Sequence, residues 1–165
     1  MEAKLNCLDN IARKVGKQFG GGIDLHGWFE IKHIRNGEVI DCRVVPNLIT
    51  NVGKAQVAGL INGVVTDYFD YIAIGTGTTA PTASDTALEG EVARGSATRS
   101  RVTTSVTDDT AQFVYTFSFD SSYAITESGV FDASSGGNML CRQTFSVINV
   151  ASGDSLQITW KVQSS

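Results

Sequence analysis

The sequence predicts a mainly β protein, an antiparallel jelly-roll-like β-sandwich with one short helix and an N-terminal helical arm. Three observations support this prediction. Apolar and polar residues alternate in several segments after residue 68, which is the period of a strand with one buried face. The dipeptide Asn36-Gly37 joins two earlier alternating runs, as in a β-hairpin. Helical spacing of apolar residues is found near the N-terminus and after Pro46.

Length and composition indicate one folded domain and exclude several partners. The chain has 165 residues, 42% of them hydrophobic, which suffices for one core and disfavours disorder. Its formal net charge of −4 provides no overall positive field for nucleic acid or an anionic membrane. No run of about 18 apolar residues occurs, so no membrane span is predicted. We therefore expect no nucleic acid and no membrane among the partners.

The first expected unit is an N-terminal arm, residues 1–22. Its apolar residues are spaced by three and four, which predicts an amphipathic helix, and Gly20, Gly21 and Gly22 then tether it to a body at residues 23–165. An isolated helix of this length is only marginally stable. We expect a partner groove or a neighbouring subunit to order it, the alternative being packing on its own domain. The candidate partner-binding residues are Leu5, Leu8, Ile11, Val15 and Phe19.

The next element is a hairpin over residues 28–45. Asn-Gly favours a two-residue type I′ turn, which sets Arg35 opposite Glu38. One face of the hairpin is then apolar and the other pairs acids with bases, a pattern that a shift of one residue would destroy. The predicted apolar pairs are Phe29 with Val44, Ile31 with Cys42, and His33 with Ile40.

A short helix and the remaining strands follow. Thr50 or Asn51 is the predicted N-cap and Asn62-Gly63 the stop, with Val57, Leu60, Ile61 and Val64 on one apolar stripe. The later segments alternate with period two, which brings the expected total to about eight strands. The clearest in-phase sets are Phe113, Tyr115, Phe117 and Phe119, and Leu156, Ile158, Trp160 and Val162.

The glycine-rich segment after residue 74 is interpreted as a structural turn. Gly75-x-Gly77-x-x-Ala80 fits a relaxed dinucleotide fingerprint, in which glycines let the backbone approach a pyrophosphate. That function requires an apolar helix directly after the glycines, inside a parallel βαβ unit. Pro81 and a polar stretch follow instead, so we expect no nucleotide and no other cofactor.

The sequence also gives no sign of catalysis. His26 and His33 have no metal-ligand spacing, and no Gly-x-Ser-x-Gly motif occurs, so we expect no metal, no catalytic residue and no small-molecule substrate. The protein is therefore not expected to be an enzyme. Most carboxylates, such as Asp85, Glu89 and Glu91, lie among turn residues and should bond their own backbone. Glu127 differs because apolar residues flank it, and residues 75–79 are its predicted N–H donors.

Three stretches together resemble a known group of proteins: "NLITNVGKAQVAGLI", "YIAIGTGTTAPTASDTALEGEVARG" and "ITESGVFDASSGGNMLCRQTF". In this order they look like small structural proteins of tailed bacteriophage virions, over roughly residues 27–162. Head-decoration, neck and tail-fibre-type proteins share this pattern. The resemblance implies a β-rich domain that self-associates, commonly as a homotrimer, and adheres to a capsid or tail surface after assembly in the host cytoplasm.

From this resemblance we expect a capsid decoration, or cement, protein. Such a protein binds the outside of the head shell at junctions of major capsid protein subunits and stabilises it by mass action. One alternative is a tail-fibre, neck or baseplate component. Another is a carbohydrate-binding β-sandwich, for which Trp28 is the best exposed aromatic candidate.

Overall fold

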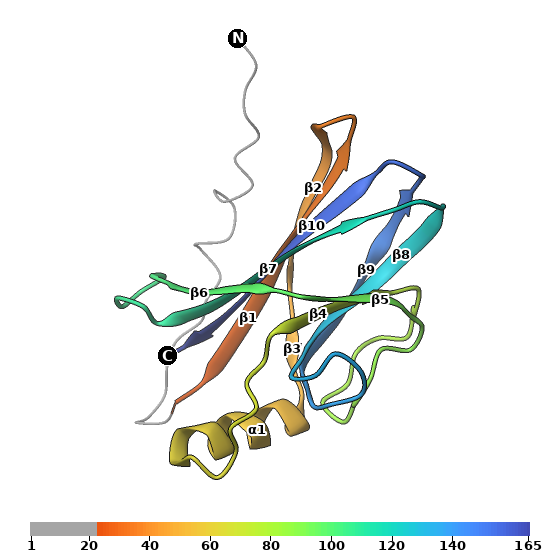
Figure 1. Ribbon diagram of the computed structural model, residues 1–165. Coiled ribbons are helices and arrows are strands. Elements are labelled where there is room, and N and C mark those ends of the chain that lie inside the picture. Colours follow the sequence, from red (N-terminus) through yellow and green to blue (C-terminus); the bar gives the residue numbers. More distant parts are fainter. Residues whose placement is uncertain (1–22) are drawn as a thin grey trace.

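The computed structural model describes residues 23–165, which form two facing antiparallel sheets and one helix (Figure 1). This part of the chain has ten strands. In order, the elements are β1 (Leu25–Arg35), β2 (Glu38–Pro46), β3 (Leu48–Ile49), α1 (Asn51–Asn62), β4 (Tyr71–Gly75), β5 (Glu91–Ser96), β6 (Thr98–Val102), β7 (Thr110–Ser118), β8 (Tyr123–Phe131), β9 (Met139–Val150) and β10 (Ser155–Ser164). One five-stranded sheet has the order β2-β1-β10-β7-β6, and the other has the order β3-β9-β8-β4-β5.

The predicted mainly β sandwich with one short helix is therefore confirmed, although the sheet order does not establish a jelly roll in particular. The strand total exceeds the expected eight because two chain segments leave one sheet and join the other. β2 is followed by β3 across Asn47, and β5 by β6 across Ala97. Each of the two lateral edges of the sandwich is thus one continuous chain segment. The predicted arm with Leu5, Leu8, Ile11, Val15 and Phe19 lies outside the described residues.

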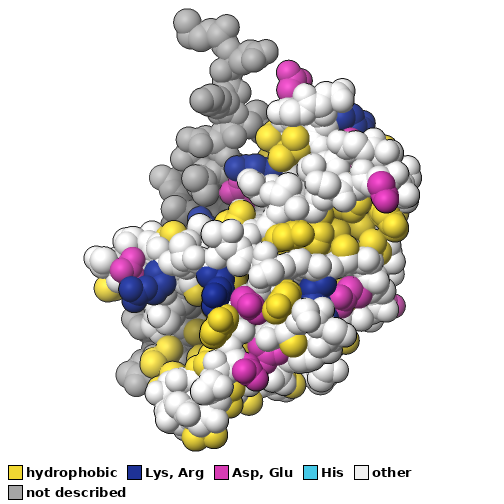
Figure 2. Space-filling view, viewed as in Figure 1, with side chains coloured by type: hydrophobic (Ala, Val, Ile, Leu, Met, Phe, Trp, Pro, Cys, Tyr) yellow, Lys and Arg dark blue, Asp and Glu magenta, His cyan; other side chains and the backbone are white. Residues whose placement is uncertain are grey.

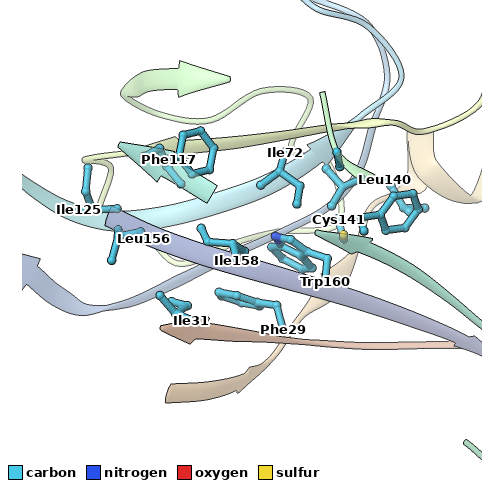
Figure 3. Packing of buried hydrophobic residues seen from close by; sticks show 14 of the residues in the cluster. Phe29, Ile31, Ile72, Phe117, Ile125, Leu140, Cys141, Leu156, Ile158 and Trp160 are labelled. Carbon is cyan, nitrogen blue, oxygen red and sulfur yellow. The ribbon is translucent and has the colours of Figure 1, made fainter. Parts of the chain in front are cut away.

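Both sheets contribute to one hydrophobic core (Figure 3). At its centre the rings of Phe29 and Trp160 stack with their centroids 4.1 Å apart, and the Trp160 indole N–H donates to Ser128 Oγ at 3.1 Å. That hydrogen bond joins β10 to β8, in the opposite sheet. The two predicted in-phase sets face this core, with Tyr115 only partly buried. The period-two pattern thus identified the buried faces of β7 and β10.

The β1–β2 hairpin has the predicted Asn36-Gly37 turn but not the predicted register. Arg35 faces Glu38 as expected, and the left-handed backbone of both turn residues, with φ values of 53° and 81°, fits a type I′ turn. The register then shifts by one residue between the His33 and Ile34 pairings. Beyond this bulge the pairs are Phe29 with Val45, Ile31 with Arg43, and His33 with Asp41, so the expected partners Val44, Cys42 and Ile40 are wrong.

The bulge is tolerated because β2 is an edge strand, where the extra residue disturbs pairing with one neighbour only. Arg43 donates to the carbonyl of Ser146 in β9, in the opposite sheet, and it also pairs with Asp41 at 2.8 Å. Charged side chains and a bulge at an edge oppose pairing with other strands. The predicted register rested on an apolar face of β2 that would be fully buried, and no side chain of this edge strand is fully buried.

Helix α1 begins and ends as predicted. The Thr50 hydroxyl accepts the Gly53 N–H at 2.9 Å, and Gly63 adopts the left-handed conformation, with φ of 74°, that ends a helix. Val57 and Leu60 pack against the core, whereas Ile61 and Val64 are 71% and 80% exposed. The predicted stripe is wrong for these two residues because α1 covers one end of the sandwich and contacts β9 through its first turns (Figure 1).

Candidate functional site

The glycine-rich loop after β4, residues 76–90, is built around the carboxylate of Glu127. This side chain lies in β8 and is fully buried. Its Oε1 accepts the N–H groups of Gly77 at 2.9 Å and Gly90 at 2.7 Å, and its Oε2 accepts the N–H of Glu89 at 3.1 Å. The loop therefore binds an anion through its backbone, and the anion is a side chain of the same chain. This confirms the structural turn. The predicted donor segment 75–79 is confirmed in part, because Gly77 donates from it whereas Glu89 and Gly90 lie outside it.

The spacing of the glycines follows from this close approach. A Cβ atom at Gly77 would lie 2.5 Å from Glu127 Oε1, and one at Gly75 would lie equally close to the same oxygen. Only residues without a side chain leave room for the carboxylate at both positions. The dinucleotide-like motif is thus explained by packing against Glu127.

Arg142, in β9, supplies the compensating positive charge. Its side chain is only 3% exposed and contacts Glu127 Oε2 through Nε at 3.0 Å and Asp85 through a terminal nitrogen at 2.7 Å. It also donates to the carbonyl of Thr79 at 3.2 Å. Sequence reasoning missed Arg142. The available signal was an arginine inside the otherwise alternating apolar segment "MLCRQTF".

Two further carboxylates hold the exposed part of this loop. Partial burial would raise the pKa of Asp85, but hydrogen bonds from Thr82 and Arg142 outweigh burial and lower it. The N–H and hydroxyl of Thr79 lower the pKa of Glu89, which also accepts the Thr78 N–H at 2.8 Å. Both residues bond nearby loop backbone, as the sequence predicted for turn carboxylates.

A second loop, residues 132–138, is fixed in a similar way from the other side. The Arg94 guanidinium donates to the carbonyls of Ala133 at 2.8 Å and Gly136 at 2.9 Å, and it lies 3.7 Å above the Phe131 ring. The Asp132 carboxylate accepts the N–H of Asn138 at 2.6 Å. Buried or half-buried ionic groups therefore determine the conformation of both long loops.

The two loops meet α1 at one end of the molecule, at the bottom of Figure 1. We call this surface the α1 end; it consists of α1, residues 64–70, and the loops 76–90 and 132–138. The N–H of Asn51 donates to the carbonyl of Ala83 at 2.8 Å, which attaches the first loop to the helix. Gln56 donates to the carbonyl of Asp67 at 2.9 Å and to the Asp132 carboxylate at 3.0 Å, which attaches the other two segments.

A separate ionic group holds the turn between β9 and β10. The Asp154 carboxylate, 2% exposed, accepts from Arg35 Nε at 2.8 Å and contacts His33 Nε2 at 2.8 Å. Hydrogen bonds from Arg35 hold the pKa of this carboxyl well below its usual range. His33 is buried as expected, but in contact with a carboxylate rather than with an apolar partner alone.

The distribution of charged side chains on the described surface is consistent with the small net charge of the sequence. On the face shown in Figure 2, acidic and basic side chains are interspersed rather than gathered by sign. Within residues 23–165 no three His, Cys, Asp or Glu side chains are placed to hold a metal ion. In the same range, α1 is too short and too polar to cross a membrane. Trp28, the aromatic proposed for carbohydrate, is half-buried in β1.

Together these features define a β-sandwich structural module with two long loops held by buried or half-buried charged side chains. The family model for podophage GP4 fiber I protein gp80 matches residues 60–162, more than half of the chain, and the chain belongs to this family. It is therefore a fibre-type structural protein of phage virions. The matched residues contain both fixed loops with Glu127 and Arg142, whereas β1 and β2 lie before them. Neither the curated proteins nor the solved structures gave a match.

Proposed function

We propose that this chain is a building block of a fibre on the phage tail, that it acts by adhesion rather than catalysis, and that it assembles as a homotrimer. The observation that carries the proposal is the family match across residues 60–162, which includes the α1 end except residues 51–59 of the helix. The description of that family names a fibre, which favours this location over the head shell.

The structure supports adhesion through its fixed loops. A surface that is already ordered before binding loses less conformational entropy when a partner docks. Glu127 and Arg142 order the loop 76–90, and Arg94 orders the loop 132–138. In a trimer, three α1 ends would act together, and such multivalency raises avidity without any new contact. No cofactor, metal or small-molecule substrate is needed for this function.

Capsid decoration is the second candidate, with the major capsid protein as partner. It is favoured by one observation, because residues 23–165 form a single sandwich and include no repeated shaft segment of the kind a fibre contains. In that case the module would bind the outside of the expanded head shell and stabilise it by mass action.

Immunogold electron microscopy of intact virions tests the location. Antibodies against this chain should label fibres at the tail, and labelling spread over the head would favour decoration. Co-sedimentation of the purified chain with isolated tails and with empty heads provides an independent measurement. Binding to heads, with a stoichiometry set by the major capsid protein, would overturn the fibre proposal. Sedimentation equilibrium tests the homotrimer.

A further inference from the structure

The α1 end contains a cavity that the structural role of the loops does not use. Its volume is about 370 Å³, within the range of small-ligand sites, and it is open to solvent. One wall is the segment before β4 and the other is the start of the loop 132–138. The lining residues are Thr66, Asp67, Tyr68, Asp70, Tyr71, Asp132, Ala133 and Ser134.

The two walls are joined to each other and to the core by hydrogen bonds. Gln56, itself buried, donates to the carbonyl of Asp67 on one wall and to the Asp132 carboxylate on the other. The N–H of Asp70 donates to the carbonyl of Phe131 at 3.1 Å, and Arg94 donates to the carbonyl of Ala133. The cavity is therefore formed before any ligand arrives.

An aromatic ring is held in position at the mouth of the cavity. Tyr68 is 52% exposed, and the Arg99 guanidinium lies 4.0 Å from its ring centroid. This cation–π contact restrains the ring while leaving half of the side chain open to solvent. An exposed, oriented tyrosine provides an apolar surface with a polar tip, onto which the C–H face of a sugar ring can pack.

The polar groups of the cavity are mainly hydrogen-bond acceptors. The Asp70 carboxylate is half-buried and has no hydrogen-bond donor among residues 23–165, and partial burial raises the pKa of this group. Asp67 and Asp132 add two more carboxylates, of which Asp132 already accepts hydrogen bonds from Gln56 and Asn138. They do not converge on a point where a metal could be bound. Acceptors that are spread over a cavity wall match the hydroxyl groups of a sugar.

We infer that this cavity binds a neutral saccharide, with one sugar ring packed on Tyr68 and its hydroxyl groups donating to the carboxylates of Asp70 and Asp67. Sugars that carry a carboxylate or sulfate are disfavoured because three aspartates line the cavity, against one adjacent cation, Arg99. The inference does not depend on whether the chain occupies a fibre or the head, since it rests on the cavity alone.

The test is retention of the full chain on an array of immobilised neutral and acidic oligosaccharides, followed by calorimetric titration with the neutral glycan that is retained. Tyr68→Ala and Asp70→Asn should each weaken binding about tenfold, the loss expected when a buried hydrogen bond or an aromatic contact is removed. Tyr123→Ala is the matched control because this tyrosine is also partly exposed but does not line the cavity. It should leave the affinity unchanged.

The inference is overturned by no retention of any neutral glycan, by stronger retention of acidic glycans, or by equal losses in Tyr123→Ala and the cavity variants. Preference for a lysine-rich peptide over every glycan would also overturn it, because the carboxylates would then serve a cationic partner. Near-UV circular dichroism of each variant confirms that the fold is intact before binding is compared.

Discussion

At the scale of single residues, the buried charges determine the shape of the α1 end. Glu127 and Arg142 lie in adjacent strands, β8 and β9, and their charges compensate each other inside the protein. Buried ion pairs contribute little to net stability compared with apolar residues, but removal of one partner leaves an uncompensated charge. We therefore interpret this pair as a device that specifies the conformation of the loop 76–90 rather than as a source of stability.

Glu127→Gln tests this interpretation. The substitution keeps the size of the side chain but leaves Arg142 with one carboxylate fewer and weakens three backbone hydrogen bonds, so the free energy of unfolding should fall by about 3 kcal/mol. Urea denaturation measures the loss, and hydrogen exchange should accelerate at Gly77, Glu89 and Gly90. Glu38→Gln, on the exposed hairpin, is the control and should change stability by less than about 0.5 kcal/mol. Equal effects of both substitutions would contradict the assigned role.

The Asp154 group predicts a dependence of stability on pH. Because Arg35 lowers the pKa of Asp154 in the folded state, its contribution is fully present above the unfolded pKa of about 3.9 and is lost as the pH falls toward the folded pKa. Wild type should exceed Asp154→Asn in urea midpoint at pH 7, and the difference should shrink below about pH 4. A difference that is constant or grows on acidification would show that the carboxylate is not the responsible group.

At the scale of elements, close contact with β9 rather than helix propensity explains the glycine at position 53 of α1. Gly53 is a poor helix former, yet it lies in the first turn. A Cβ atom at this position would lie 2.4 Å from the Leu140 carbonyl oxygen and 2.7 Å from Leu140 Cα. These are backbone atoms of β9, which cannot move aside as a flexible side chain can. The glycine therefore allows the helix to lie directly on the sheet.

Gly53→Ala distinguishes the two effects. Propensity alone would stabilise the helix by about 1 kcal/mol, whereas the clash with the backbone of β9 should cost about 1–3 kcal/mol, toward the upper end because backbone cannot move aside. We expect a net loss of stability in chemical denaturation. Lys54→Ala, at the exposed neighbouring position, also improves propensity and should not destabilise the protein. Stabilisation by Gly53→Ala would show that α1 is not packed as described.

At the scale of the whole molecule, the sandwich behaves as one unit because its sheets are connected both along the chain and by side chains. The chain passes between the sheets at both lateral edges, and Trp160 bonds Ser128 across the core. The largest buried side chains come from both sheets. A domain with one such core generally unfolds in a single cooperative transition.

Trp28→Phe provides the test. The chain has two tryptophans, and this substitution leaves Trp160 as the fluorescent one. Fluorescence then reports the core between the sheets, and far-UV circular dichroism reports the strands. The two urea transitions should coincide, with equal midpoints and slopes. Separate midpoints would mean that the sheets come apart before they unfold.

The sequence by itself determined the class of fold and most local features. Period-two alternation located the buried faces of β7 and β10, Asn36-Gly37 located the hairpin turn, and Thr50 and Gly63 bounded the helix. These features depend on interactions within a few residues or on one continuous face, which a single sequence displays directly. The resemblance to phage virion structural proteins agrees with the family to which the chain belongs.

Only the tertiary structure decided what depends on residues distant in the chain. It placed Arg142 beside Glu127 and Asp85, gave the β1–β2 hairpin a bulge because β2 lies at an edge, and left Ile61 and Val64 exposed beyond the end of the sheets. It also brought residues 66–71 and 132–134 together around one cavity. No pattern along the chain encodes these results, because pairing across the sheets sets which side chains meet and which faces are covered.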